Sequence, residues 1–166
     1  MPLPHRLLWP DESATRTFAA ALALQPGLGQ AFVTLHGDLG AGKTTFARHL
    51  LQALGVGGRI KSPTYAIVEA YEPAAFPVWH FDFYRFNDPQ EWEEAGFRDM
   101  FASPGLKLAE WPQKAEGLLP LADLDIHLET EGEAARRVTL CSHTALGASL
   151  LQGLCGTPAA PTGASA

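Results

Sequence analysis

The chain has 166 residues, of which 46% are hydrophobic and 18% are charged, a composition typical of one globular domain that buries roughly two-thirds of its unfolded surface. Its 12 Lys and Arg against 18 Asp and Glu give a net charge of −6, which argues against strong nucleic-acid binding through phosphate neutralisation alone. With only Cys141 and Cys155, no leader and no early apolar stretch long enough to cross a bilayer, the protein is expected to be cytoplasmic with reduced thiols.

The first part of the chain alternates between strand-like and helix-like segments. A short edge strand is expected at residues 6–9, and a proline followed by acidic residues precedes a helix expected over residues 15–24. After a Pro-Gly break, the apolar run 31–35 is too short for a helix and predicts a buried strand. From Thr44 onward apolar residues recur with helical spacing, and Gly55 ends the segment.

The second part of the chain favours further strands around an acidic segment, residues 87–100, in which helix is expected. The strand-like runs are residues 66–71, 78–81, 106–111, 124–128 and 137–140. A short connection containing Gly132 joins the last two runs, which indicates an antiparallel hairpin. The whole pattern predicts an α/β fold whose central sheet is mostly parallel with antiparallel additions.

The most specific signal is GDLGAGKT at residues 37–44, which matches the G-x-x-x-x-G-K-[ST] pattern between the expected strand and the expected helix. Glycines in such a loop let backbone N–H groups curl around phosphate oxygens, and the positive end of the following helix points at the same anion. Lys43 is expected to reach the β- and γ-phosphates, Thr44 to offer its hydroxyl to Mg²⁺, and Thr45 to contact the α-phosphate. The loop residues expected to bind nucleotide are Asp38, Leu39, Gly40, Ala41, Gly42, Lys43, Thr44 and Thr45.

A magnesium ion at such a loop needs a second anchor, usually an acid at the end of a neighbouring strand. Two positions fit: Asp82 follows one expected strand, and Glu110 lies near the end of another. Either acid could instead cap a nearby helix. The sequence leaves the order of these two candidates open.

Four segments in fixed order give the chain a resemblance to a known family: GDLGAGKTT from Gly37, SPTY from Ser62, HFDFYR from His80 and EWP from Glu110. Together they resemble the TsaE ATPases of bacterial tRNA threonylcarbamoyladenosine biosynthesis, over roughly residues 7–140. The resemblance implies a P-loop NTPase-like fold with three layers, and the use of ATP and Mg²⁺. It also implies TsaB and TsaD as partner proteins, with tRNA contacted indirectly through the complex.

The resemblance also assigns roles to single residues. Thr44 and Glu110 correspond to magnesium contacts, Asp82 to a Walker-B-like acid, and Thr64 to a switch residue that senses the γ-phosphate. The residues expected to take part in catalysis are thus Lys43, Thr64, Asp82 and Glu110.

Three further positions carry weaker expectations. Glu12 and Arg137 resemble family positions close to the adenine or ribose, although surface charge is the alternative for both. Trp111 either lines the nucleotide pocket, marks a partner surface, or fills the core at the end of a strand.

We expect one P-loop ATPase domain over residues 1–155. Residues 156–166 carry no charged or aromatic side chain and too little apolar mass to offset the entropy lost on ordering, so a disordered tail is expected there.

The expected function is ATP binding and hydrolysis that change the fit of the protein to its partners. The alternative is a small-molecule P-loop kinase, which should carry a lid with phosphate-clamping arginines; the eight arginines here are dispersed. A GTP switch needs an Asn-Lys-x-Asp stretch, and none occurs. The six histidines show no His-x-x-x-His pair, so no transition-metal cluster is expected.

Overall fold

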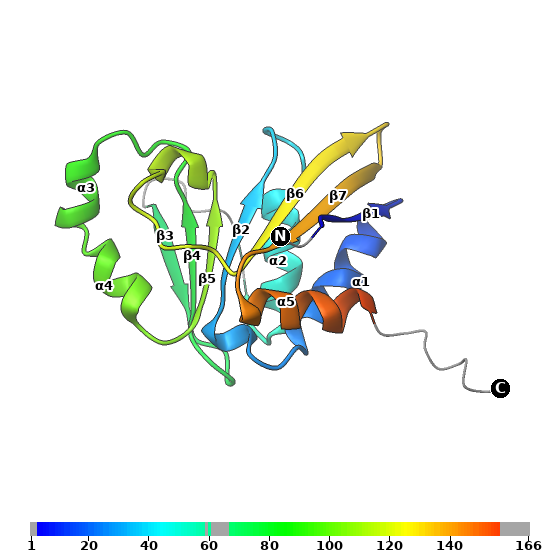
Figure 1. Ribbon diagram of the computed structural model, residues 1–166, viewed down its shortest axis with the longest axis horizontal. Helices are drawn as coiled ribbons and strands as arrows, with labels where there is room; N and C mark the ends of the chain where they lie inside the picture. Colours follow the sequence, from blue (N-terminus) through cyan, green and yellow to red (C-terminus); the bar gives the residue numbers. More distant parts are fainter. Residues whose placement is uncertain (1–2, 59, 61–66, 157–166) are drawn as a thin grey trace.

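Seven strands form one mixed sheet in the computed structural model, which describes residues 3–58, 60 and 67–156 (Figure 1). The strands are β1 (His5–Trp9), β2 (Phe32–His36), β3 (Val68–Tyr71), β4 (Val78–Asp82), β5 (Leu106–Glu110), β6 (Leu124–Glu131) and β7 (Ala135–Ser142). The α-helices are α1 (Glu12–Ala23), α2 (Lys43–Ala53), α3 (Pro89–Glu94), α4 (Phe97–Ala102) and α5 (Ala145–Leu151). Shorter helical turns are η1 (Leu28–Gln30), η2 (Pro112–Ala115) and η3 (Gln152–Gly156).

The strand order is β1-β7-β6-β2-β5-β4-β3. The four central strands β6, β2, β5 and β4 run parallel, whereas β7, β1 and β3 pair antiparallel at the two margins. This arrangement confirms the α/β prediction of a parallel centre with antiparallel additions. It also brings the carboxyl ends of β2, β4 and β5 to the same edge of the sheet.

Side chains alternate between two hydrophobic cores on opposite faces of the sheet. On β5, Leu108 points into the core that contains residues of α1 and α2, and Ala109 points into the core that contains residues of α3 and α4. The second core is built largely from aromatic rings; Phe81, for example, stacks on Phe101 with the ring centroids 4.6 Å apart. Helices on both faces give the three layers expected for this class of fold.

Most predicted elements are confirmed, with shifts at their ends. The expected helix at 15–24 begins earlier, at Glu12, because the Asp11 carboxylate caps it by accepting from the Ala14 N–H at 3.1 Å. A disordered tail is expected over residues 156–166. Gly156 is instead the last residue of η3, and residues 157–166 lie outside the described residues.

Within the described ranges, none of the helices has the length and apolar character needed to cross a bilayer.

Helix α5 is the element that the sequence analysis did not assign. Thr144 caps it, because its hydroxyl accepts from the Gly147 N–H at 3.0 Å and donates to the Asp123 carboxylate at 2.6 Å. The second Asp123 oxygen accepts from the Phe32 N–H at 2.7 Å. These bonds tie α5 to the first residues of β2 and β6.

Gly147 provides a test of this docking, because a Cβ added there would lie 1.7 Å from the Asp123 carbonyl oxygen. Alanine raises helix propensity by up to about 1 kcal/mol, but overpacking costs about 1–3 kcal/mol. Gly147→Ala is therefore expected to lower the free energy of unfolding in urea by about 2 kcal/mol. The exposed Ser149→Ala in the same helix should leave stability unchanged or slightly higher, and equal stability of both variants would contradict the close packing.

Candidate functional site

The loop between β2 and α2 is shaped by glycine at two positions. Gly37 lies so close to β6 that a Cβ would approach the Leu128 carbonyl oxygen to 2.6 Å. Gly42 caps the start of α2 with a φ of 109°, a backbone conformation that strongly favours glycine. The loop thereby delivers the positive end of an 11-residue helix to the edge of the sheet.

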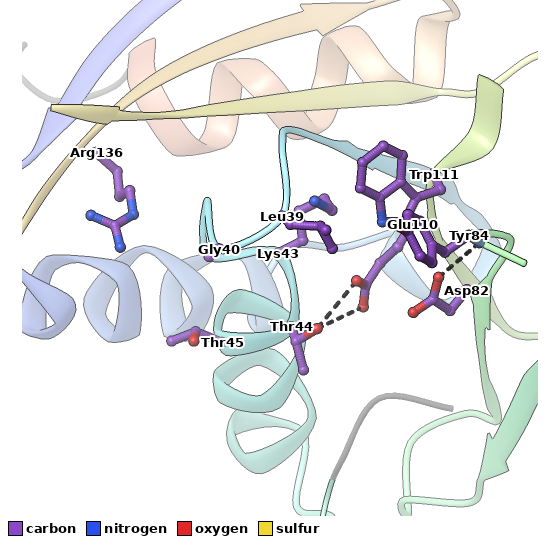
Figure 2. A pocket seen from close by; sticks show the side chains of 11 residues that line it. Leu39, Gly40, Lys43, Thr44, Thr45, Asp82, Tyr84, Glu110, Trp111 and Arg136 are labelled. Carbon is purple, nitrogen blue, oxygen red and sulfur yellow. Dashed lines mark hydrogen bonds between the residues drawn. The ribbon is translucent and has the colours of Figure 1, made fainter. Parts of the chain in front are cut away.

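A cavity of about 350 Å³ opens at this helix end (Figure 2). Its lining residues are Leu39, Gly40, Gly42, Lys43, Thr44, Thr45, Asp82, Tyr84, Glu110, Trp111 and Arg136. They come from the loop, from the first turn of α2, from the ends of β4 and β5 and the residues after them, and from β7. The structure therefore brings the loop and both candidate acids into one site.

Lys43 is buried at 5% exposure and folds back over its own loop. Its Nζ donates to the carbonyl oxygens of Gly37 and, at 3.0 Å, Asp38, and it lies 4.4 Å from the centroid of the Trp111 ring. Burial lowers the pKa of Lys43, and the nearby carboxylates, Glu110 above all, oppose that shift. The ammonium group is thus a poorly hydrated cation in a site open to an anionic ligand.

Asp82 and Glu110 are direct neighbours in the pairing of β4 with β5. The Glu110 carboxylate is 2% exposed and accepts from the Thr44 hydroxyl, with oxygen distances of 3.2 and 3.4 Å. Asp82 is half-buried and accepts from the Tyr84 N–H at 3.0 Å through Oδ1, so it also orders the turn after β4. The choice between the two acids thus has a structural answer, because both lie in the cavity (Figure 2).

His80 is a member of the site to which the sequence analysis gave no role there. It is fully buried, and its Nε2 lies 2.7 Å from the Glu110 Oε2. Its Nδ1 has no hydrogen-bond partner among the described residues. The signal in the sequence was the two-residue spacing from Asp82, which places both side chains on one face of β4.

The oxygen atoms in the cavity suit a magnesium ion. The Thr44 hydroxyl and both carboxylates are hard oxygen donors, and Mg²⁺ takes few protein oxygens in addition to water and phosphate. In this structure the hydroxyl already contacts Glu110. Thr44, Glu110 and Asp82 are therefore the residues that could hold the ion.

A smaller cavity, of about 90 Å³, adjoins the first and shares Gly42, Thr45 and Arg136 with it. Glu12 lines it as well, with its Oε2 2.8 Å from His49 Nε2. The hydrogen bond with His49 is the main reason why the pKa of Glu12 is lowered. The structure thus places Glu12 close to the loop, as its expected role requires.

Arg137 is not brought to either cavity, in contrast to the expectation. It pairs with Glu129, at 3.2 Å, and with Glu131 on the other face of the sheet. Arg136 occupies the site instead, and its Nε donates to the Ala41 carbonyl oxygen at 2.8 Å. Successive side chains of a strand point to opposite faces, so a shift of one residue along β7 exchanges the two arginines.

Trp111 follows Glu110 in an unusual backbone conformation. Its φ of 57° is the one positive value outside glycine in the described part of the chain. The half-buried ring packs against Tyr84, with centroids 5.0 Å apart, and lines the cavity. Of the three expectations for Trp111, the structure supports two, because the ring lines the cavity and also packs against the second hydrophobic core.

The expected switch residue Thr64 lies outside the described residues.

Comparisons with known proteins were consistent with one another. The model of the family described as "Threonylcarbamoyl adenosine biosynthesis protein TsaE" matches residues 9–138. A protein of Haemophilus influenzae named tRNA threonylcarbamoyladenosine biosynthesis protein TsaE is 44% identical over 119 residues, covering 72% of this chain and 75% of the relative. Its Bacillus subtilis namesake is 35% identical over 137 residues, covering 82% and 84%. A crystal structure of YdiB from Bacillus subtilis superposes with a TM-score of 0.73 at 27% identity, covering 93% of this chain and 97% of YdiB.

The His80–Glu110 contact yields a stability prediction. His80→Ala leaves the buried Glu110 carboxylate without its imidazole partner, and we expect it to lower the free energy of unfolding in urea by about 3 kcal/mol. His80→Gln retains a donor and should lose less. The double variant His80→Ala, Glu110→Gln should recover part of the loss, because a neutral amide is cheaper to bury. If His80→Ala and the double variant lose the same free energy of unfolding, the two side chains are not coupled.

Proposed function

The chain belongs to the TsaE family and acts in tRNA threonylcarbamoyladenosine biosynthesis, and from its site we propose that it does so as an ATP-binding and Mg²⁺-dependent ATP-hydrolysing component. The observation that carries the proposal is the contact between Thr44, in the first turn of the loop helix, and the Glu110 carboxylate. A phosphate loop, a lysine and two strand-end acids in one cavity are the parts that phosphoryl chemistry on a nucleotide requires.

In the proposed mechanism the loop and Lys43 bind the phosphate chain. A phosphate group entering at the start of α2 competes with the Gly37 and Asp38 carbonyl oxygens for the Lys43 ammonium group. Because that ammonium is buried, its attraction to phosphate is less screened than at the surface. The nucleoside end of ATP would extend past Thr45 toward Glu12 and Arg136, which line the adjoining cavity.

The bound Mg²⁺ would neutralise charge that develops on the phosphate oxygens. We assign its protein contacts to Thr44 and Glu110, with Asp82 beside them as the acid that orients water. His80 acts as a positioning residue, because its hydrogen bond fixes the orientation of the Glu110 carboxylate. Thr64 is proposed as the γ-phosphate sensor on the basis of its place in the SPTY segment.

We further propose that ATP turnover changes the fit of the chain to TsaB and TsaD, and that tRNA is contacted through these partners. The net charge of −6 supports this division of work, because a strongly negative chain gains little from the phosphates of RNA. Helices α3 and α4 carry an acidic surface whose one arginine, Arg98, is paired with Glu93. This surface is a candidate docking face for a basic surface of a partner.

The proposal is tested by ATP hydrolysis measured with and without TsaB and TsaD, alongside formation of threonylcarbamoyladenosine in tRNA. Lys43→Ala should abolish both activities and weaken nucleotide binding about tenfold to a hundredfold, since a charge-assisted contact contributes about 1.5–3 kcal/mol. Glu110→Gln and Asp82→Asn should reduce Mg²⁺-dependent hydrolysis strongly while leaving metal-free ADP binding nearly unchanged. Transfer of the γ-phosphate to a metabolite rather than to water would overturn the proposal in favour of a kinase.

The adjacent arginines of β7 form a matched pair of variants. Arg136→Ala should weaken ATP binding about tenfold, because it removes a cation from the cavity wall, whereas Arg137→Ala should leave ATP binding within error. Isothermal titration calorimetry of both variants measures the difference. A larger effect at Arg137 than at Arg136 would contradict the placement of the nucleoside.

A further inference from the structure

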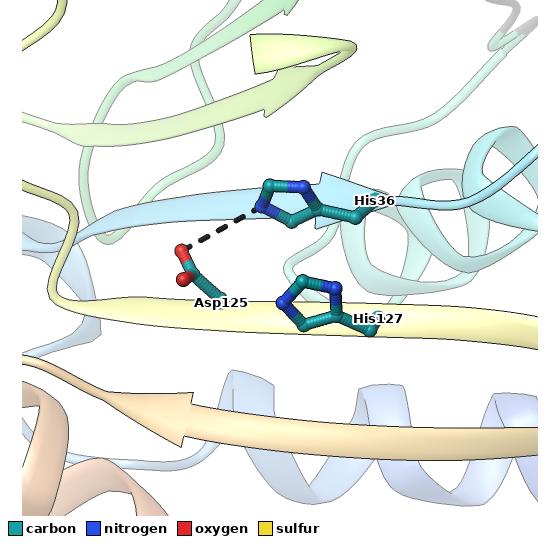
Figure 3. A group of neighbouring side chains, drawn as sticks. All are labelled: His36, Asp125 and His127. Carbon is teal, nitrogen blue, oxygen red and sulfur yellow. Dashed lines mark ion pairs between the residues drawn. The ribbon is translucent and has the colours of Figure 1, made fainter. Parts of the chain in front are cut away.

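Two histidines and an aspartate gather on one face of the sheet where β2 lies beside β6 (Figure 3). In the parallel pairing of these strands His36 is opposite His127, and Thr34 is opposite Asp125. Side chains two residues apart on a strand share a face, so all these groups converge. The expectation of no transition-metal cluster considered only the spacing of histidines along the chain, whereas these side chains come together across two strands.

The donor atoms of the three side chains are close together. One ligand atom from each of His36, Asp125 and His127 lies within 4.8 Å of the other two. His36 Nε2 is 3.7 Å from Asp125 Oδ1, and the two imidazole rings stack with centroids 4.2 Å apart. Ligands on a tetrahedral Zn²⁺ with bonds of 2.0–2.1 Å are about 3.4 Å apart. A ring nitrogen binds a metal in the plane of its ring, so binding requires the two stacked imidazoles to rotate out of their stack as well as to close by about 1 Å.

Neighbouring polar groups already orient the cluster. The Thr34 hydroxyl, itself buried, donates to Asp125. It also lies 3.0 Å from His36 Nε2, a contact that a bound ion would replace. His143 Nε2 lies 2.6 Å from the second Asp125 oxygen. Metal sites commonly hold their ligating side chains through an outer set of hydrogen bonds of this kind. Here Asp125 is fixed from both sides.

The cluster borders a cavity of about 410 Å³ that lies next to the Lys43 cavity and shares only Leu39 with it. Both imidazoles line it, together with Gly37, Asp38 and Leu39 of the loop. The side chains of His36 and Asp125 are only 26% and 19% exposed, so they are partly shielded but remain reachable from solvent. A bound ion would have room for a water or another small ligand on its open side.

We propose that His36, Asp125 and His127 form a binding site for a divalent transition-metal ion, with Zn²⁺ as the ion it fits. Two imidazoles and one carboxylate are a donor set that suits Zn²⁺, whereas Mg²⁺ prefers oxygen ligands only. Three protein ligands leave one tetrahedral position open toward the cavity. This site is distinct from the cation site at Thr44 and Glu110, and it does not depend on nucleotide hydrolysis.

The test is a competition titration of Zn²⁺ between the full chain and a chromophoric chelator, in excess Mg²⁺ and without nucleotide. One Zn²⁺ is expected per chain. His127→Asn and Asp125→Asn should each lower the affinity at least about 100-fold, and Thr34→Val, which removes only an orienting hydroxyl, about tenfold. His5→Gln, on the edge strand β1, and Glu110→Gln should both retain the site, and the second excludes zinc capture by the His80–Glu110 pair.

Thermal unfolding and diffraction test the site even if a ligand variant folds poorly. Zn²⁺ should raise the Tm of the parent chain and of His5→Gln by the same amount, and should raise the Tm of Thr34→Val by less. Anomalous diffraction from a Zn²⁺-soaked crystal should place the ion between His36, Asp125 and His127. Affinity unchanged in His127→Asn, or a single anomalous peak at Glu110, would overturn the proposal while leaving the proposed ATPase function untouched.

Discussion

The buried Glu110 carboxylate is the group on which the arrangement of the site depends. It joins three elements that are distant in sequence, because it accepts from Thr44 on α2, pairs with His80 on β4, and itself ends β5. A carboxylate that is 2% exposed is stable only where such partners compensate its lost hydration. The parallel order β2-β5-β4 is what places all three together.

The same cavity concentrates two other costly features. Lys43 is a buried cation that the adjacent carboxylates stabilise. Trp111 holds a left-handed backbone directly before Pro112, a conformation that costs roughly 1–3 kcal/mol for a bulky residue. Its ring gains contacts with Lys43 and Tyr84 in return. Strain and buried charge at one place are characteristic of sites that bind a ligand rather than of simple packing.

The sequence predicted most helices and strands correctly. It did not predict which side chains meet across adjacent strands of the sheet. Alternation and glycine punctuation located β2, the loop and α2, because these are local properties of the chain. The pairing of His80 with Glu110, and that of His36 with His127, depends on which strands become adjacent, and no local pattern encodes this. Arg137 was expected near the site from the family resemblance, and local sequence could not show that the adjacent Arg136 faces the cavity instead. Helix α5 was missed because its Thr144 cap precedes only seven helical residues.

The turn between β6 and β7 has a consequence for the evolution of the chain. Glu131 pairs with Ala135 across it, and this alignment sets which arginine faces the phosphate loop. A change that slid the ladder by one position would turn Val138 and Leu140 outward, toward solvent. The hydrophobic core and the arginine of the cavity wall would be lost together, so the chain can vary at this hairpin only where the strand register is kept.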